Sequence, residues 1–305
     1  MVIILSSPPV APPLPPNRWQ GATLTWFGAD GSVWDLATGL GGAVLEEAGT
    51  EGLHNPVVKK FTSESRVVPG NRLRGWRTES REVFWPILIY SNTNADEWKD
   101  RYRAFFKSIH PEIPGRWRIG HGGTYRELEL TGIFDDPHAF QHDPLVFGWE
   151  KFGVALEAAQ PYWSGEPMQL GPWSQPETGE FFGEDGAPDF FISSSAEIGR
   201  ARVSNPGDVD AWMTWTCVGP LTDIEIGIGD DVAMVPFDLA DGEVLVIDTD
   251  PRRQSGTLDG VDVTKELGLL RYGAIPPGAD VEVHVEAGGV GSISGMLVPL
   301  YFRAM

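Results

Sequence analysis

Short runs in which apolar and polar residues alternate recur along the whole chain and predict a protein made mostly of β-strands. In the first half, Ala22–Phe27 and Ser32–Leu36 flank the turn Gly28–Gly31, which carries Asp-Gly at its end, and this pattern predicts a β-hairpin. The other strands predicted in this half are Glu82–Trp85 continuing into Ile87–Tyr90, Arg116–Ile119, Tyr125–Thr131 and Leu145–Leu156. Pro86 interrupts one of these runs and indicates an edge strand or a bulge there.

One segment, about residues 94–110, has the period of an amphipathic helix instead. A single apolar stripe runs along it, formed by Trp98, Tyr102, Phe105, Phe106 and Ile109. Asn94 is a good N-cap, Glu97 is placed to complete a capping box, and Pro111 ends the segment. An aromatic stripe of this kind is typical of a helix that covers a sheet.

The second half contains only strand and turn patterns. Its predicted strands are Ile198–Val203, Ala211–Val218, Asp223–Ile228, Glu243–Ile247, Asp280–Val285 and Ile293–Phe302. A spacing of roughly 10–15 residues between them is typical of a β-sandwich.

These patterns divide the chain into four parts. Residues 1–20 form a Pro-rich extended arm, either a loose tail or a strap onto a neighbouring subunit. Residues 21–165 form a β-barrel or sandwich domain with the one packed helix. Residues 166–190 are Gly- and Pro-rich and form a linker or the start of the second domain, and residues 191–305 form the β-sandwich.

Net charge narrows the possible partners. The chain carries −20 overall, and residues 1–165 account for −3 of it, so that the remainder carries −17. An acidic surface repels phosphate, so we expect no sequence-specific nucleic-acid binding and no membrane docking. The N-terminal residues lack a signal-peptide pattern, and no apolar stretch is long enough to span a membrane, so we expect synthesis in the cytoplasm.

The single cysteine, Cys217, excludes a disulfide within the chain. It lies in an alternating run, Met213–Val218, and is interpreted as a small buried apolar side chain.

The best metal-ligand spacing is His138 and His142, with Asp135, Asp136 and Asp143 beside them. Two histidines four residues apart share a metal ion when they lie on one helix. Pro137 and Pro144 bracket the segment and prevent such a helix, so we interpret it as a polar surface loop.

No other pattern indicates catalysis. The acidic pairs Asp135-Asp136 and Asp230-Asp231 are adjacent in sequence and point apart on turns. The glycine runs Gly39–Gly42 and Gly288–Gly291 match no phosphate-binding loop, and Gly291–Gly295 has Ile where a nucleophile elbow needs Ser. We therefore expect no catalytic residue, no metal site and no cofactor.

The twelve tryptophans leave a binding function open. Those inside alternating strands are expected in a core or a subunit interface: Trp26, Trp34, Trp85, Trp117 and Trp215. Trp163 and Trp173 lie in segments rich in Pro and Gly, where exposed rings on loops could stack on sugars. A carbohydrate-binding module is thus the alternative function.

The order of several segments resembles the distal tail proteins of siphophages, in particular the minor tail proteins of phages that infect actinobacteria. In the first half the resemblance rests on Thr25–Leu36, Glu51–Leu53 and the Pro-aromatic signature in Ala158–Trp163. In the second half it rests on the Asn-x-Gly-Asp turn in Val203–Asp208, the strand Glu243–Thr249 and the Pro-Gly turn Ile275–Ala279, where Ala279 stands in place of the family's Asn.

This resemblance implies a structural virion protein. The first domain would form a hexameric ring at the distal end of a long non-contractile tail, and the second would be galectin-like. The implied partners are other copies of the chain, the tail tube protein, the tail-tip hub and the tape measure protein, around a channel for DNA. In the alternative, the chain would be a carbohydrate-binding module of a tail tip that recognises host cell-wall glycans. A closed ring needs a heterologous contact between two different patches.

Overall fold

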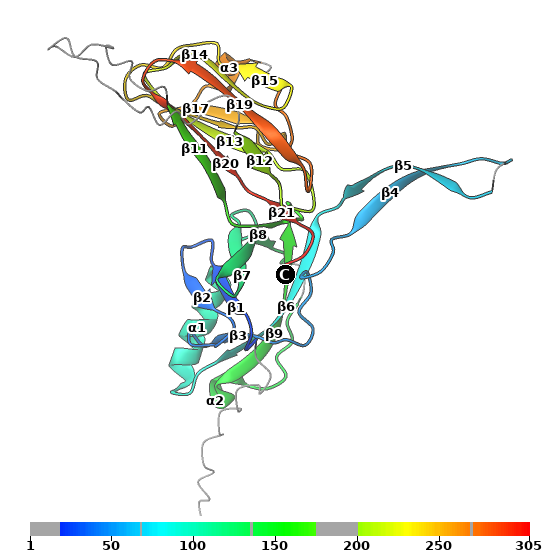
Figure 1. The fold of residues 1–305 in the computed structure, drawn as a ribbon. Helices are drawn as coiled ribbons and strands as arrows, with labels where there is room; N and C mark the ends of the chain where they lie inside the picture. The colour runs from blue at the N-terminus through cyan, green and yellow to red at the C-terminus, as the bar shows by residue number, and fades with distance from the viewer. Residues whose placement is uncertain (1–18, 68, 135–136, 175–200, 269–270) are drawn as a thin grey trace, which may run out of the picture. The chain divides into compact units, whose positions relative to one another are not determined.

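The computed structural model describes residues 19–67, 69–134, 137–174, 201–268 and 271–305. The chain forms two units, one from residues up to Ser164 together with Tyr301–Met305, the other from Gly165–Leu300 (Figure 1). Both are built mostly of strands, which confirms the predicted fold class. The predicted arm lies outside the described residues except for Trp19 and Gln20, as do residues 175–190 of the predicted linker. Among the described residues, no helix has the length and apolar character needed to span a membrane.

Unit 1 is a strongly curved sheet with the strand order β2-β1-β7-β8-β9-β6-β3; β10 pairs with β8, and β21 pairs with β10. The Leu45 amide at one end of the sheet donates to the carbonyl of Leu36 at the other, at 2.9 Å, so the sheet is nearly closed. Its strands and helices are β1 Thr23–Phe27, β2 Val33–Asp35, β3 Ala43–Leu45, β4 Val58–Glu64, β5 Asn71–Thr78, β6 Arg81–Tyr90, α1 Ala95–Lys107, β7 Gly115–His121, β8 Thr124–Gly132, α2 Pro144–Phe147, β9 Trp149–Ala158, β10 Trp163–Ser164 and β21 Leu300–Tyr301.

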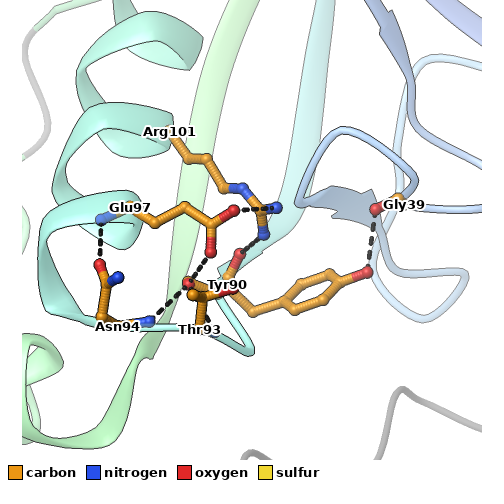
Figure 2. Close-up of polar contacts among 7 residues, drawn as sticks. Gly39, Tyr90, Thr93, Asn94, Glu97 and Arg101 are labelled. Atoms are coloured by element: carbon orange, nitrogen blue, oxygen red, sulfur yellow. Dashed lines mark hydrogen bonds and ion pairs between the residues drawn. The ribbon is translucent and has the colours of Figure 1, made fainter.

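Helix α1 covers the core of unit 1 as the apolar stripe predicts. Trp98 and Phe105 are buried, and Tyr102 and Phe106 pack against the same core. The Asn94 side chain accepts a hydrogen bond from the Glu97 amide at 2.8 Å, which confirms the N-cap (Figure 2). The reciprocal half of the capping box is absent, because the Glu97 carboxylate is held by Ser91 and Arg101 instead (Figure 2).

Pro86 lies within an interior strand and causes no bulge opposite β9, where the register from Arg81 to Tyr90 is continuous. Its carbonyl accepts from the Glu46 amide, so the side on which it has no N–H to donate faces β3, which has ended at Leu45. The proline therefore costs no hydrogen bond to β9 and lacks only the reciprocal bond to Glu46, where β3 has ended.

The predicted strand Leu145–Leu156 is wrong at its start. Leu145–Phe147 belong to the short helix α2, in which Asp143 caps the Leu145 amide and Pro144 takes the first turn. Gly148 ends the helix with a positive φ of 72°, and β9 begins at Trp149.

Unit 2 is a β-sandwich of two sheets. One has the order β11-β20-β13-β16-β17-β18 and the other β12-β19-β14-β15, with one apolar core formed from both. Its elements are β11 Met168–Ser174, β12 Arg202–Ser204, β13 Met213–Val218, β14 Thr222–Ile228, β15 Asp231–Met234, β16 Val244–Asp248, β17 Ser255–Leu258, β18 Val261–Asp262, α3 Thr264–Leu267, β19 Asp280–Gly288 and β20 Ser292–Leu297. Part of the predicted linker is thus a strand, β11.

Candidate assembly surfaces

The strands β4 and β5 form a two-stranded sheet of their own, called here the ribbon (residues 58–78), which projects from the rest of unit 1 (Figure 1). Its attachment is at the base, where the Tyr162 hydroxyl donates to the Thr78 hydroxyl at 2.8 Å and the ring of Trp76 lies 6.4 Å from that of Phe302. An isolated pair of strands is only marginally stable in water. Contact with a partner would therefore stabilise the ribbon.

Side chains on the ribbon are apolar or basic to an unusual degree. Phe61, Leu73 and Trp76 are 44%, 56% and 50% exposed. Six basic residues and one acidic residue occupy positions 58–78, in a chain whose overall charge is −20. Lys59 lies directly opposite Arg77, and Arg77 pairs with Glu79 at 3.0 Å. The other basic side chains leave the ribbon with a net positive charge, which an acidic partner surface would complement.

A second exposed apolar surface lies in the segment that leads into β9, called here the α2 segment (residue 134 and residues 137–147). Five of its large apolar side chains are between 40% and 63% exposed, namely Phe134, Phe140, Leu145, Val146 and Phe147. Exposed apolar side chains concentrated in one short segment are typical of a docking site.

The two surfaces lie at opposite ends of β6. The ribbon runs directly into the start of β6 at Arg81, whereas Ser91, just after its end, donates its amide to the carbonyl of Gly148 beside α2. A strand of ten residues spans about 33 Å. Unit 1 thus presents two different exposed surfaces far apart, as a head-to-tail contact requires.

The histidines of the sequence-predicted metal candidate face one buried carboxylate, which the sequence did not reveal. Glu150 on β9 is 3% exposed. Its Oε1 lies 3.9 Å from His138 Nε2, and its Oε2 lies 3.6 Å from His142 Nε2. His142 Nε2 also lies 2.8 Å from the carbonyl of Trp149. The three side chains do not bring one ligand atom each within 4.8 Å of one another, so they form no chelating group. Asp135 and Asp136 lie outside the described residues.

The sugar-binding alternative needed Trp163 and Trp173 exposed on loops, and the structure corrects both placements. Trp163 is in β10, is fully buried and lies 5.2 Å from the ring of Trp117. Trp173 is in β11 and 7% exposed. A sugar stacks on an open ring face, and neither ring has one.

The remaining candidate residues are either buried in a core or paired at the surface. Cys217 is buried, and burial raises its pKa to about 12, which confirms the apolar interpretation and makes the thiol a poor nucleophile. Asp231 begins β15 and pairs with Arg271 at 3.0 Å. The five strand tryptophans expected in a core or an interface are all in the cores of the two units.

Sequence reasoning missed the ribbon altogether. Its signal was present in two runs of seven and eight residues on either side of Pro69-Gly70, together with the cluster of basic residues. The alternation is weak there because both faces of the ribbon are exposed.

No protein-family model and no curated protein matches the sequence. Among solved structures, the chain is similar to the SPP1 Dit protein, described as a paradigm of the hub adsorption apparatus in phages that infect Gram-positive bacteria. The TM-score is 0.60 at 11% identity, covering 92% of this chain and 98% of that one. It is also similar to a chain of the phage P2 baseplate in its activated conformation with Ca, with a TM-score of 0.53 at 11% identity, covering 90% and 97%. Over nearly its whole length, this chain therefore has the fold of these phage tail and baseplate proteins.

Proposed function

We propose that this protein is a structural component of a long non-contractile phage tail and forms a hexameric ring at the distal end of the tail tube. The observation that carries the proposal is the similarity in fold to the SPP1 Dit protein over 92% of this chain and 98% of that one. The ring joins the tube to the tail-tip hub and leaves a channel for DNA. The tail tube protein, the hub and the tape measure protein are its proposed neighbours, and no reaction is part of this role.

Unit 1 supplies the ring contact in this proposal. The basic, apolar ribbon of one copy lies on the neighbouring copy, and the α2 segment is the complementary surface. Three aspartates and no lysine or arginine lie between Phe134 and Phe147, so its charge is opposite to that of the ribbon. Because the two surfaces differ, the contact is heterologous, and with a rotation of one sixth of a turn per copy it closes into the ring instead of a two-fold dimer.

Solution mass by light scattering, followed by negative-stain imaging of the same peak, tests the proposal. One chain has a mass of 33.4 kDa, so a six-fold ring has a mass of about 200 kDa and a central hole. We expect the double variant Lys59→Glu, Arg77→Glu to elute as a folded monomer, because it reverses two facing charges and lowers the net charge of residues 58–78 from +5 to +1.

The matched control is Arg103→Glu with Lys265→Glu, which changes the net charge equally at exposed positions on α1 and α3. It should still form the ring. A wild type that stays monomeric at all concentrations, also when mixed with tail tube protein, contradicts the ring. If the ribbon variant still forms the ring, the ribbon does not make the contact between copies.

A further inference from the structure

The outer face of the four-stranded sheet in unit 2 carries a cluster of ligating side chains that the tail role does not use. Ile226, Val283 and Val285 point into the core of the sandwich. The residues that alternate with them, Glu225 on β14 and His284 and Glu286 on β19, therefore point outward. We propose that these three side chains bind one divalent transition-metal ion, Zn²⁺ or an ion of similar preference.

Convergence of the ligand atoms supports the site. One carboxylate oxygen from each glutamate and one imidazole nitrogen of His284 all lie within 4.8 Å of one another. His284 Nε2 is 3.3 Å from Glu225 Oε2. Ligand bonds of about 2.0–2.1 Å in a tetrahedral site place two ligand atoms roughly 3.3 Å apart, so this pair already has the separation that zinc needs. Within the part of the chain that the structure describes, it is the one group of three such residues to converge.

Charge on this face also favours a cation. The strand register places Glu225 directly opposite Glu286, and two like charges in that relation destabilise a sheet. Arg202, which lies on the same face opposite Glu282, is bound to Asp280 at 2.9 Å. In the described residues, no ion pair joins either glutamate to a lysine or arginine, and His284 is the basic group beside Glu225. A metal ion coordinated by both carboxylates would remove the repulsion between Glu225 and Glu286.

The donor set selects the class of metal. Imidazole nitrogen with carboxylate oxygens suits Zn²⁺ and its first-row neighbours, whereas Ca²⁺ and Mg²⁺ take oxygen ligands. Three protein ligands leave a fourth position for water. The side chains of His284 and Glu225 are 37% and 32% exposed, so solvent reaches the group.

Calorimetric titration of the full-length protein with Zn²⁺, in a buffer that does not chelate metals, tests the site. We expect one saturable site per chain and no comparable binding of Ca²⁺ or Mg²⁺. Loss of a group that merely orients a ligand costs about 10–100-fold in metal affinity, so His284→Ala and Glu286→Gln should each weaken binding by at least that factor. Both positions are on the surface of the sheet, and near-ultraviolet circular dichroism will show that the variants remain folded.

The matched control is Glu282→Gln, which removes the same charge from the same face of β19, two residues from His284. It should bind Zn²⁺ like the wild type. Co²⁺ should add visible absorption bands in the wild type that are lost in His284→Ala. No saturable Zn²⁺ binding in the wild type, or equal binding in Glu286→Gln, would overturn the proposal. The site lies within unit 2 and does not depend on the ring, so either proposal can fail alone.

Discussion

Arg81 shows how a single side chain can hold separate segments of unit 1. It is 2% exposed, and its guanidinium donates to the carbonyls of Gly52, His54, Pro161 and Phe302. Burial lowers its pKa to about 10, which still leaves it charged at neutral pH. A buried charge is tolerated when its hydrogen-bonding groups are satisfied, here by four backbone acceptors.

Replacing Arg81 with Met should lower the free energy of unfolding of unit 1 by about 3–5 kcal/mol, because four carbonyls lose a charged donor. Urea unfolding followed by tryptophan fluorescence measures this, since nine of the twelve tryptophans precede Gly165. The exposed Arg77→Met is the control and should change stability by less than about 0.5 kcal/mol. Equal effects of the two substitutions would show that the carbonyl contacts do not matter.

At the scale of one element, α1 shows how a helix start is tied to its sheet. Arg101 donates to the carbonyl of Tyr90 at 2.7 Å and pairs with Glu97 at 2.8 Å, while the Tyr90 hydroxyl donates to the carbonyl of Gly39 (Figure 2). The hydrogen bond from Ser91, followed by that from Thr93 and the charge of Arg101, holds the pKa of Glu97 below its ordinary value of 4.5. The ionised carboxylate therefore stabilises the join between β6 and α1.

This contact should make stability depend on pH in the acid range. Since the pKa of Glu97 is lowered in the folded state, its contribution is complete above 4.5 and is lost as the pH falls through the folded value. We expect Glu97→Gln to be less stable than the wild type in urea at pH 6, and the difference to shrink at pH 3. Asp100→Asn, on the exposed side of α1, should show no such change. A difference that stays constant with pH would exclude the carboxylate as its source.

At the scale of the whole molecule, the two units do not follow the chain in simple succession. The predicted second domain runs to residue 305, but Tyr301–Met305 belong to unit 1. Ala304 is buried there and donates its amide to the carbonyl of Leu53 at 2.9 Å, and Arg126 stacks on the ring of Tyr301 at 3.6 Å. Unit 1 therefore needs the end of the chain, and a fragment of residues 1–165 would lack it.

Removing Tyr301–Met305 should destabilise unit 1 and leave unit 2 unchanged. Scanning calorimetry of the shortened chain should show one transition moved to lower temperature, with the loss of tryptophan signal in the same range. Removing only Met305, which is 65% exposed, is the control and should have no effect. A shift of every transition, or of none, would contradict this assignment of the last residues.

The strands, the helix and the core tryptophans could be predicted because their signals are local. The stripe from Trp98 to Ile109, the N-cap Asn94 and the alternation around Cys217 each lie within a few residues, and the structure confirms them. The ends of elements depend on single residues outside the apolar pattern and were predicted less well. Asp143, Pro144 and Gly148 together make a single helical turn from residues whose apolar run resembles a strand.

The sequence by itself thus determined the β class of both halves, the long helix and the strands with clear alternation, and the absence of any familiar catalytic motif. It did not reveal the ribbon or the helical turn at α2. Tertiary structure alone decided which distant residues meet: Arg81 with Phe302, His138 and His142 with Glu150, and Glu225 with His284. Glu225 and His284 are 59 positions apart and come together through the register of β14 and β19. Such a register is fixed by the packing of the whole sheet, because a shift of one residue in either strand would turn the side chain on that strand into the core.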